Sequence, residues 1–191
     1  IEAAGGHAAA VQAGLLDTHL QASRAAREKA VSSRRRTLVG VNNYPDITEK
    51  QAAEGPFPPP DDGGVPAVRL AAPFEAMRAR TARHAASTGR TPVVHLLTRG
   101  DVKMRMARAN FCQNFFGCAG FDITQGPDVP ATVDVLVLCS ADAEYPALAQ
   151  AVVPTAQAPV IVAGHPKGLL ETLTTAGVQG FVHIQSDAVQ T

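Results

Sequence analysis

A regular alternation of short apolar runs with helical stretches over residues 93–184 constrains this 191-residue chain more than any other feature. The apolar runs, expected to be strands, are 93–97, 121–123, 133–138, 159–163 and 181–184. Helical patterns occupy 102–116, 143–153 and 169–176. Near-continuous apolar strands that alternate with helices are typical of a parallel sheet covered on both faces. The pattern therefore predicts an α/β fold of the flavodoxin-like class, a five-stranded parallel sheet in the order 2-1-3-4-5.

The connection between the second and third predicted strands breaks this regularity. Only nine residues, two of them prolines, separate Ile123 from Val133. A parallel crossover normally takes a dozen or more residues and usually contains a helix. Two interpretations stay open. Either the second helix of the fold is missing, or residues of the natural chain are missing from this sequence.

Residues 1–90 follow a different plan. Residues 7–33 have helical composition interrupted at Gly14, so they fit two short helices or one long one. Residues 37–41 predict a short β-type segment, and a further helix is expected over 73–86, with proline in its first turn. Apolar side chains recur along these helices, but no strands accompany them to complete a core, so we expect them to pack on something else. These residues are Val11, Leu15, Leu20, Phe74 and Met77.

Proline and glycine dominate the stretch between these helices, and residues 55–64 predict a linker. The sequence opens at Ile1 as if within a helical region, without the basic and then apolar pattern of a signal peptide. We therefore expect the chain to be the C-terminal part of a longer polypeptide.

Composition excludes several classes of protein. No apolar run reaches the ~18 residues of a membrane span, so no membrane association is expected. The 17 basic and 17 acidic residues cancel and tryptophan is absent, which argues against a nucleic-acid partner. Three cysteines, Cys112, Cys118 and Cys139, form neither a disulfide framework nor a metal-binding spacing. A reducing, cytoplasmic location is therefore expected.

Four tracts resemble a known family. Residues 1–23 (IEAAGGHAAAVQAGLLDTHLQAS), 37–46 (TLVGVNNYPD) and 73–81 (PFEAMRART) are similar to the adenosylcobalamin-dependent acyl-CoA mutases. Residues 95–126 (HLLTRGDVKMRMARANFCQNFFGCAGFDITQG) are similar to the small subunits of methylmalonyl-CoA mutases. The resemblance implies three parts. Residues 1–44 would be the C-terminal tail that closes a (β/α) barrel, 45–90 a linker and helix, and 91–191 a degenerate cobalamin-binding-like domain.

The family's cobalamin domain carries Asp-x-His-x-x-Gly after its first strand, and that histidine ligates cobalt. Here Asp101 is available, but no histidine occurs between His95 and His165. His95 lies inside a predicted strand, where a core or edge histidine is expected, and His165 is interpreted as a surface-loop residue. Nearby Lys103, Arg105 and Arg108 add positive charge that a corrin-bound cobalt would not need.

Two further pocket motifs of the family are partly retained. Its Ser-x-Leu appears as Ser140-Ala141-Asp142, and its Gly-Gly appears as Ala163-Gly164. Asp142 and Glu144 stand at a helix start, where the helix dipole explains them without catalysis. We therefore expect no catalytic, cofactor-binding or metal-ligating residue, only vestigial pocket positions. These are Thr98, Gly100, Asp101, Ser140 and Gly164.

The resemblance implies a non-catalytic subunit fragment without a cofactor of its own. Its partner in a heterodimer would be the mutase large subunit, which binds adenosylcobalamin and interconverts methylmalonyl-CoA and succinyl-CoA by a radical mechanism in propionate metabolism. Two alternatives stay open. One is a corrinoid-binding domain without a protein lower ligand, and the other is a flavodoxin-like interaction module.

Overall fold

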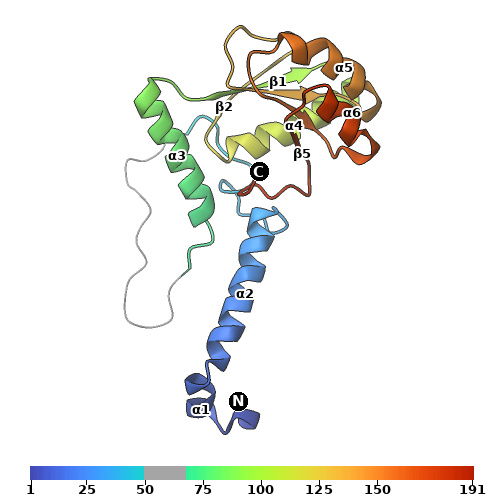
Figure 1. The fold of residues 1–191 in the computed structure, drawn as a ribbon. Coiled ribbons are helices and arrows are strands. Elements are labelled where there is room, and N and C mark those ends of the chain that lie inside the picture. The colour runs from blue at the N-terminus through green and yellow to red at the C-terminus, as the bar shows by residue number, and fades with distance from the viewer. Residues whose placement is uncertain (50–67) are drawn as a thin grey trace.

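The computed structural model describes residues 1–49 and 68–191. Its centre is a five-stranded, all-parallel sheet in the order β2-β1-β3-β4-β5 (Figure 1). The strands are β1 (Val93–Thr98), β2 (Asp122–Gly126), β3 (Val135–Cys139), β4 (Val160–Ala163) and β5 (Gly180–Val182). The predicted flavodoxin-like α/β fold is confirmed, including its strand order.

Helices cover both faces of the sheet because side chains alternate between the two faces along each strand. On one face, Val94 and Leu96 of β1 pack with Ala109, Cys112 and Phe115 of α4 (Val102–Gly117). The opposite face packs against α5 (Tyr145–Val152) and α6 (Leu170–Thr175). Three 3₁₀ turns complete this region: η2 (Asp142–Glu144), η3 (Val153–Thr155) and η4 (Lys167–Leu169).

The crossover from β2 to β3 contains no helix. Residues 127–134 run from the end of one strand to the start of the other, as both interpretations of this short connection require of the given sequence. The strands lie on either side of β1. At about 3.3 Å per residue, eight extended residues are long enough to return along the sheet and pass over one strand. The two prolines in this stretch disfavour a helix.

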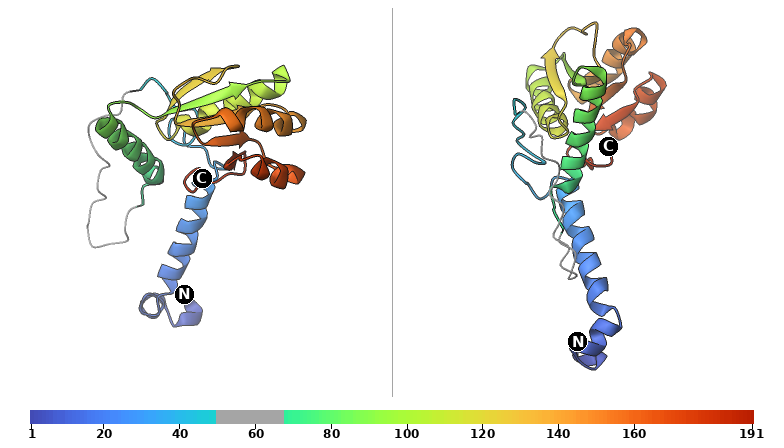
Figure 2. Two further views of the ribbon diagram at one scale, coloured as in Figure 1. Left: turned by 45° about the horizontal axis from the view of Figure 1, so that its top comes forward. Right: turned by 90° about the vertical axis from the view of Figure 1, so that its left-hand side faces the viewer.

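The N-terminal residues form an arm that projects away from the sheet (Figures 1 and 2). The turn η1 (Glu2–Ala4) and α1 (His7–Gln12) lead into α2 (Leu15–Ser32). Of the two arrangements predicted for this region, two helices are present, because Gly14 adopts the left-handed conformation with φ 69°. Within the described residues, no helix is long and apolar enough to cross a membrane.

The predicted β-type segment at residues 37–41 is wrong. These residues form a turn in which only an isolated bridge joins Val39 to Asn43. The cause is the buried side chain of Asn42, which accepts a hydrogen bond from the Leu38 backbone N–H at 2.8 Å. Its amide nitrogen donates to the carbonyls of Val31 and Arg36, both at 2.8 Å. A side chain that satisfies the backbone locally competes with strand pairing.

Helix α3 (Ala72–Thr88) agrees with the helix predicted over 73–86. The expectation that Phe74 packs on something outside this chain is wrong. Phe74 is buried with Val31 at the end of α2 and Cys118 after α4. Val11 and Leu20 on the arm do remain exposed. The predicted linker at 55–64 lies outside the described residues.

Candidate functional site

The carboxyl ends of the strands are the place where parallel α/β sheets usually bind ligands. The loops that follow β1, β3, β4 and β5 meet there, and we call the space between them the carboxyl-end crevice. The structure brings all the predicted pocket positions to this edge. Thr98 ends β1, and the others follow β1, β3 or β4: Gly100, Asp101, Ser140 and Gly164.

The Glu144 carboxylate fills the first part of the crevice. It lies 2.5 Å from Ser140 Oγ and accepts the backbone N–H groups of Ala141 and Asp101 at 3.1 and 3.2 Å. The Ser140 hydroxyl, followed by these two N–H groups, holds the pKa of Glu144 below its ordinary value. A Cβ built on Gly100 would collide with the Glu144 carboxylate and Ser140 Oγ. The space above Gly100 is therefore occupied by the protein itself.

Asp101 has a structural role in the same loop. Its side chain accepts the backbone N–H of Met104 at 2.8 Å and so caps the first turn of α4. Thr98 is buried at the end of β1. The family's histidine has no counterpart in residues 98–104, so this loop offers no imidazole to a metal ion.

An ion-pair network fills the second part of the crevice. Arg108 Nη2 lies 2.8 Å from Asp142 Oδ1, and Lys167 Nζ lies 3.2 Å from Asp142 Oδ2. The Arg108 guanidinium also lies against Gly164, where an added Cβ would come within 3.2 Å of Nη1. The Asp142 carboxylate thus joins α4 to the loop after β4.

Sequence reasoning noted the charge of Arg108 but did not predict its partner, Asp142. One signal was available. Arg108 is seven residues, about two helical turns, after the N-cap Asp101, so it lies on the face of α4 that follows the loop after β1. The pairing of Arg108 with Asp142 depends on the order of the strands, which places α4 beside the loop after β3.

Two histidines lie side by side at the far end of the crevice. The ring centroids of His165 and His183 are 4.8 Å apart. Each Nδ1 accepts a backbone N–H two residues further on, from Lys167 at 3.0 Å and from Gln185 at 3.2 Å. Burial, followed by the charges of His165 and Arg108, lowers the pKa of His183. Sequence analysis did not identify this pair.

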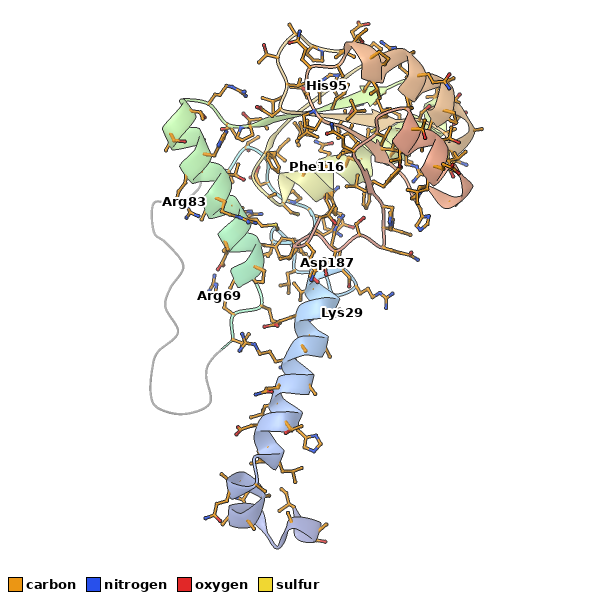
Figure 3. All side chains as sticks on the ribbon, viewed as in Figure 1. Lys29, Arg69, Arg83, His95, Phe116 and Asp187 are labelled. Carbon is orange, nitrogen blue, oxygen red and sulfur yellow. The ribbon has the colours of Figure 1, made fainter. Side chains whose placement is uncertain are left out.

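His95 is a core histidine, as expected. It is only 4% exposed, and its Nδ1 lies 2.8 Å from Thr124 Oγ1 on β2. Burial lowers its pKa. It lies within β1 rather than in the loops that form the crevice (Figure 3).

No metal-binding site is found among the residues that the structure describes. No group of three or more histidine, cysteine or acidic side chains there could hold a metal ion. The three cysteines are buried and unpaired, and burial raises the pKa of Cys112 well above its ordinary value. A low-pKa, exposed thiolate, which reactive cysteines require, is therefore not provided by Cys112.

Comparisons with known proteins extend the picture. A family model described as methylmalonyl-CoA mutase matches residues 1–88. The methylmalonyl-CoA mutase small subunit of Porphyromonas gingivalis is 33% identical over 215 aligned residues, which cover 100% of this chain and 34% of that protein. The small subunit of Streptomyces virginiae is 32% identical over 163 residues, covering 80% of this chain and 26% of that protein.

A probable methylmalonyl-CoA mutase small subunit of Mycobacterium tuberculosis is 34% identical over 136 residues, covering 63% of this chain and 20% of that protein. The chain therefore spans about a third or less of the length of the relatives it matches. The P. gingivalis alignment covers both the N-terminal arm and the sheet, so the likeness extends beyond the family-model match. The resemblance found in the sequence tracts is confirmed, and the chain belongs to the methylmalonyl-CoA mutase family.

Proposed function

We propose that this chain is a non-catalytic part of a methylmalonyl-CoA mutase, consisting of a barrel-closing tail and a degenerate cobalamin-binding-like domain. Its role is to support a large subunit in a heterodimer. The large subunit then carries adenosylcobalamin and interconverts methylmalonyl-CoA and succinyl-CoA by a radical mechanism. The observation that carries this proposal is the carboxyl-end crevice, which the chain fills with its own Glu144 and Arg108 side chains.

The residues of the crevice do not fit a corrinoid. The loop after β1 offers no histidine, and the Glu144 carboxylate occupies the space above Gly100. Arg108 lies against Gly164, and its charge is balanced by Asp142. A bound cofactor would have to displace both carboxylates from their partners, leaving partly buried charges unpaired, which is costly.

An absorbance titration tests the cofactor part of this proposal. The purified 191-residue chain is titrated with adenosylcobalamin, and protein-bound corrin is measured after gel filtration. We expect no corrin absorbance in the protein peak. The same result is expected for a variant with a histidine restored in the loop, Lys103→His, because Glu144 and Arg108 still fill the crevice. Stoichiometric binding at micromolar concentration would overturn the non-catalytic proposal.

The proposed heterodimer is supported by the relatives, whose names describe them as small subunits. It is also supported by the arm, on which Ile1, Val11 and Leu20 are 58%, 48% and 46% exposed. Contiguous exposed apolar surface is typical of protein–protein contacts, and the proposal assigns these side chains of the arm to such a contact. A cytoplasmic location for this assembly is consistent with three free cysteines.

Co-purification from the source cell tests the partnership. Tagged chain should capture a mutase large subunit, identified by mass spectrometry, and the double variant Val11→Ser/Leu20→Ser should capture less. Leu170→Ser is the matched control, because Leu170 is also exposed but lies on α6 of the sheet domain. Equal recovery with the arm variant and the control would show that the arm is not the contact surface.

The two alternatives predict different results in these experiments. A corrinoid-binding domain without a lower ligand would take up adenosylcobalamin with the spectrum of a cofactor that has no protein ligand. A cavity of about 290 Å³ beside Asp142, lined by Tyr145, Val162 and Leu173 among others, is the feature that favours it. A flavodoxin-like interaction module would bind neither the cofactor nor a mutase large subunit.

A further inference from the structure

The loops after β4 and β5 each contain a turn that a histidine side chain closes. In each, a histidine Nδ1 accepts the backbone N–H two residues further along, at His165–Lys167 and His183–Gln185. This is the geometry that an asparagine makes in an Asx turn. An imidazole accepts at Nδ1 only while that nitrogen carries no proton. Both turns therefore require neutral histidines.

Positive charge already surrounds these two rings. Burial lowers the pKa of His183, followed by the charges of His165 and of Arg108 on α4. Lys167 of η4 lies beside His165 in the same turn and contributes a second permanent charge. A single carboxylate, Asp142 of η2, pairs with both of these cations. A proton on either ring adds a further positive charge to a network with one negative group.

The segment after β5 connects this network to the N-terminal arm. The His183 backbone N–H donates to Ser186 Oγ at 3.0 Å, and the Ser186 N–H donates to the His183 carbonyl at 2.9 Å. Just beyond, Ser32 Oγ at the end of α2 donates to Asp187 Oδ2 at 2.7 Å. The Ala188 N–H donates to the Ser32 carbonyl at 2.9 Å. Figure 3 shows Asp187 at the end of α2 that meets the sheet domain.

We propose that His165 and His183 form a proton-sensitive latch that holds the segment 183–191 against α2 when both rings are neutral and releases it on acidification. Protonation removes the two turn hydrogen bonds and places an imidazolium beside Arg108. The released segment carries Asp187 and Ala188 away from Ser32, so the connection between the sheet and the arm loosens. The latch rests on the geometry of these loops and does not depend on the function proposed above.

The direction of the pH dependence follows from the His183 ring. Its pKa is lowered in the folded chain, so the unfolded chain binds the proton more readily. The contribution of the latch to stability is therefore complete above the unfolded value of about 6.5 and is lost as the pH falls below it. His95 is buried and adds a background of the same sign, so the test compares variants rather than the parent chain alone.

Nuclear magnetic resonance titration of the whole 191-residue chain between pH 8 and 5 tests the latch. His165→Asn keeps an acceptor for the Lys167 N–H but cannot take a proton. We expect about fourfold tighter proton binding at His183 in H165N, the size expected for one charge about 5 Å away in a water-like dielectric. In the parent chain, the Ala188 amide signal should move with the midpoint of His183.

The control variant is His84→Asn, which changes an exposed histidine on α3. It should leave the His183 midpoint unchanged. If His183 titrates with the same midpoint in H165N and in the parent chain, the two rings are not coupled. If the Ala188 amide signal does not change with the titration of His183, the segment is not released. If H165N does not fold, His183→Asn provides the second measurement. Its stability should fall less between pH 7.5 and 5.5 than that of the parent chain, and an equal fall would contradict the proposal.

Discussion

Arg90 and Asp134 form a two-pronged ion pair at the amino ends of β1 and β3. Arg90 Nη1 lies 2.6 Å from Asp134 Oδ2, and Nη2 lies 2.7 Å from Oδ1. Oδ2 also accepts the Val93 backbone N–H at 2.7 Å. Asp134 directly precedes β3 and is the last residue of the crossover 127–134. The pair therefore fixes where that crossover returns to the sheet.

Asp134→Asn should weaken the fold in a pH-dependent way. The Arg90 guanidinium, followed by the Val93 N–H, lowers the pKa of Asp134 to about 2. The stabilisation is thus complete above the ordinary value near 3.8 and is lost as the pH falls toward 2. Because the pair is partly exposed, we expect a loss of about 0.5–1 kcal/mol in the free energy of unfolding at pH 7.

Urea unfolding at pH 7 and pH 3 measures this effect. The difference between the parent chain and D134N should be smaller at pH 3. Asp128→Asn, an exposed position in the same crossover, is the control and should change stability little at either pH. A constant difference between parent and D134N at both pH values would contradict the role of the charge.

Gly100→Ala should destabilise the fold more than Gly89→Ala. Both glycines have left-handed φ, 80° and 78°, so each substitution carries the same backbone strain of about 1–2 kcal/mol. Nothing lies within 4 Å of a Cβ at Gly89, whereas a Cβ at Gly100 meets the Glu144 carboxylate and Ser140 Oγ. Thermal or urea unfolding of the two variants isolates the clash.

Removing the carboxylate provides the matching test. In the double variant G100A/E144A, the extra cost at Gly100 relative to Gly89 should shrink, since the obstructing group is gone. Equal stability losses for G100A and G89A in the parent background would show that Glu144 does not occupy this part of the crevice in solution.

Asn42→Ala should cost about 1–3 kcal/mol. The substitution leaves the Leu38 N–H and the carbonyls of Val31 and Arg36 without the partner that the buried Asn42 amide provides. Asn43→Ala removes only the acceptor of the Arg34 guanidinium and should cost less. The measurement is the free energy of unfolding in urea, and a smaller loss for N42A than for N43A would sink this account of the turn.

Phe74→Ala should destabilise the isolated chain by about 3 kcal/mol, because it opens a cavity between α3, the end of α2 and Cys118. Leu20→Ala on the exposed arm should change stability by less than about 0.5 kcal/mol. Calorimetry on both variants decides between packing inside the chain and packing on a partner. Similar small losses for both variants would indicate that Phe74 packs on a partner, as the sequence pattern predicted, and not inside this chain.

Local pattern was sufficient for much of the fold. The periodicity of apolar residues places all five strands and the principal helices, because each element must bury one face or one stripe. The interval between Ile123 and Val133 is too short for the usual crossover helix, since chain length limits what it can contain. The sequence alone also shows that residues 98–104 contain no histidine.

Only tertiary structure decided how the crevice is filled. Glu144 meets Asp101, Arg108 meets Asp142 and His165 meets His183 across 43, 34 and 18 residues of chain. Periodicity assigns a side chain to a face of its own element, but which distant side chain it meets depends on strand order and on the path of each loop. The same reason explains Phe74, whose burial requires α3, α2 and the end of α4 to converge at one point.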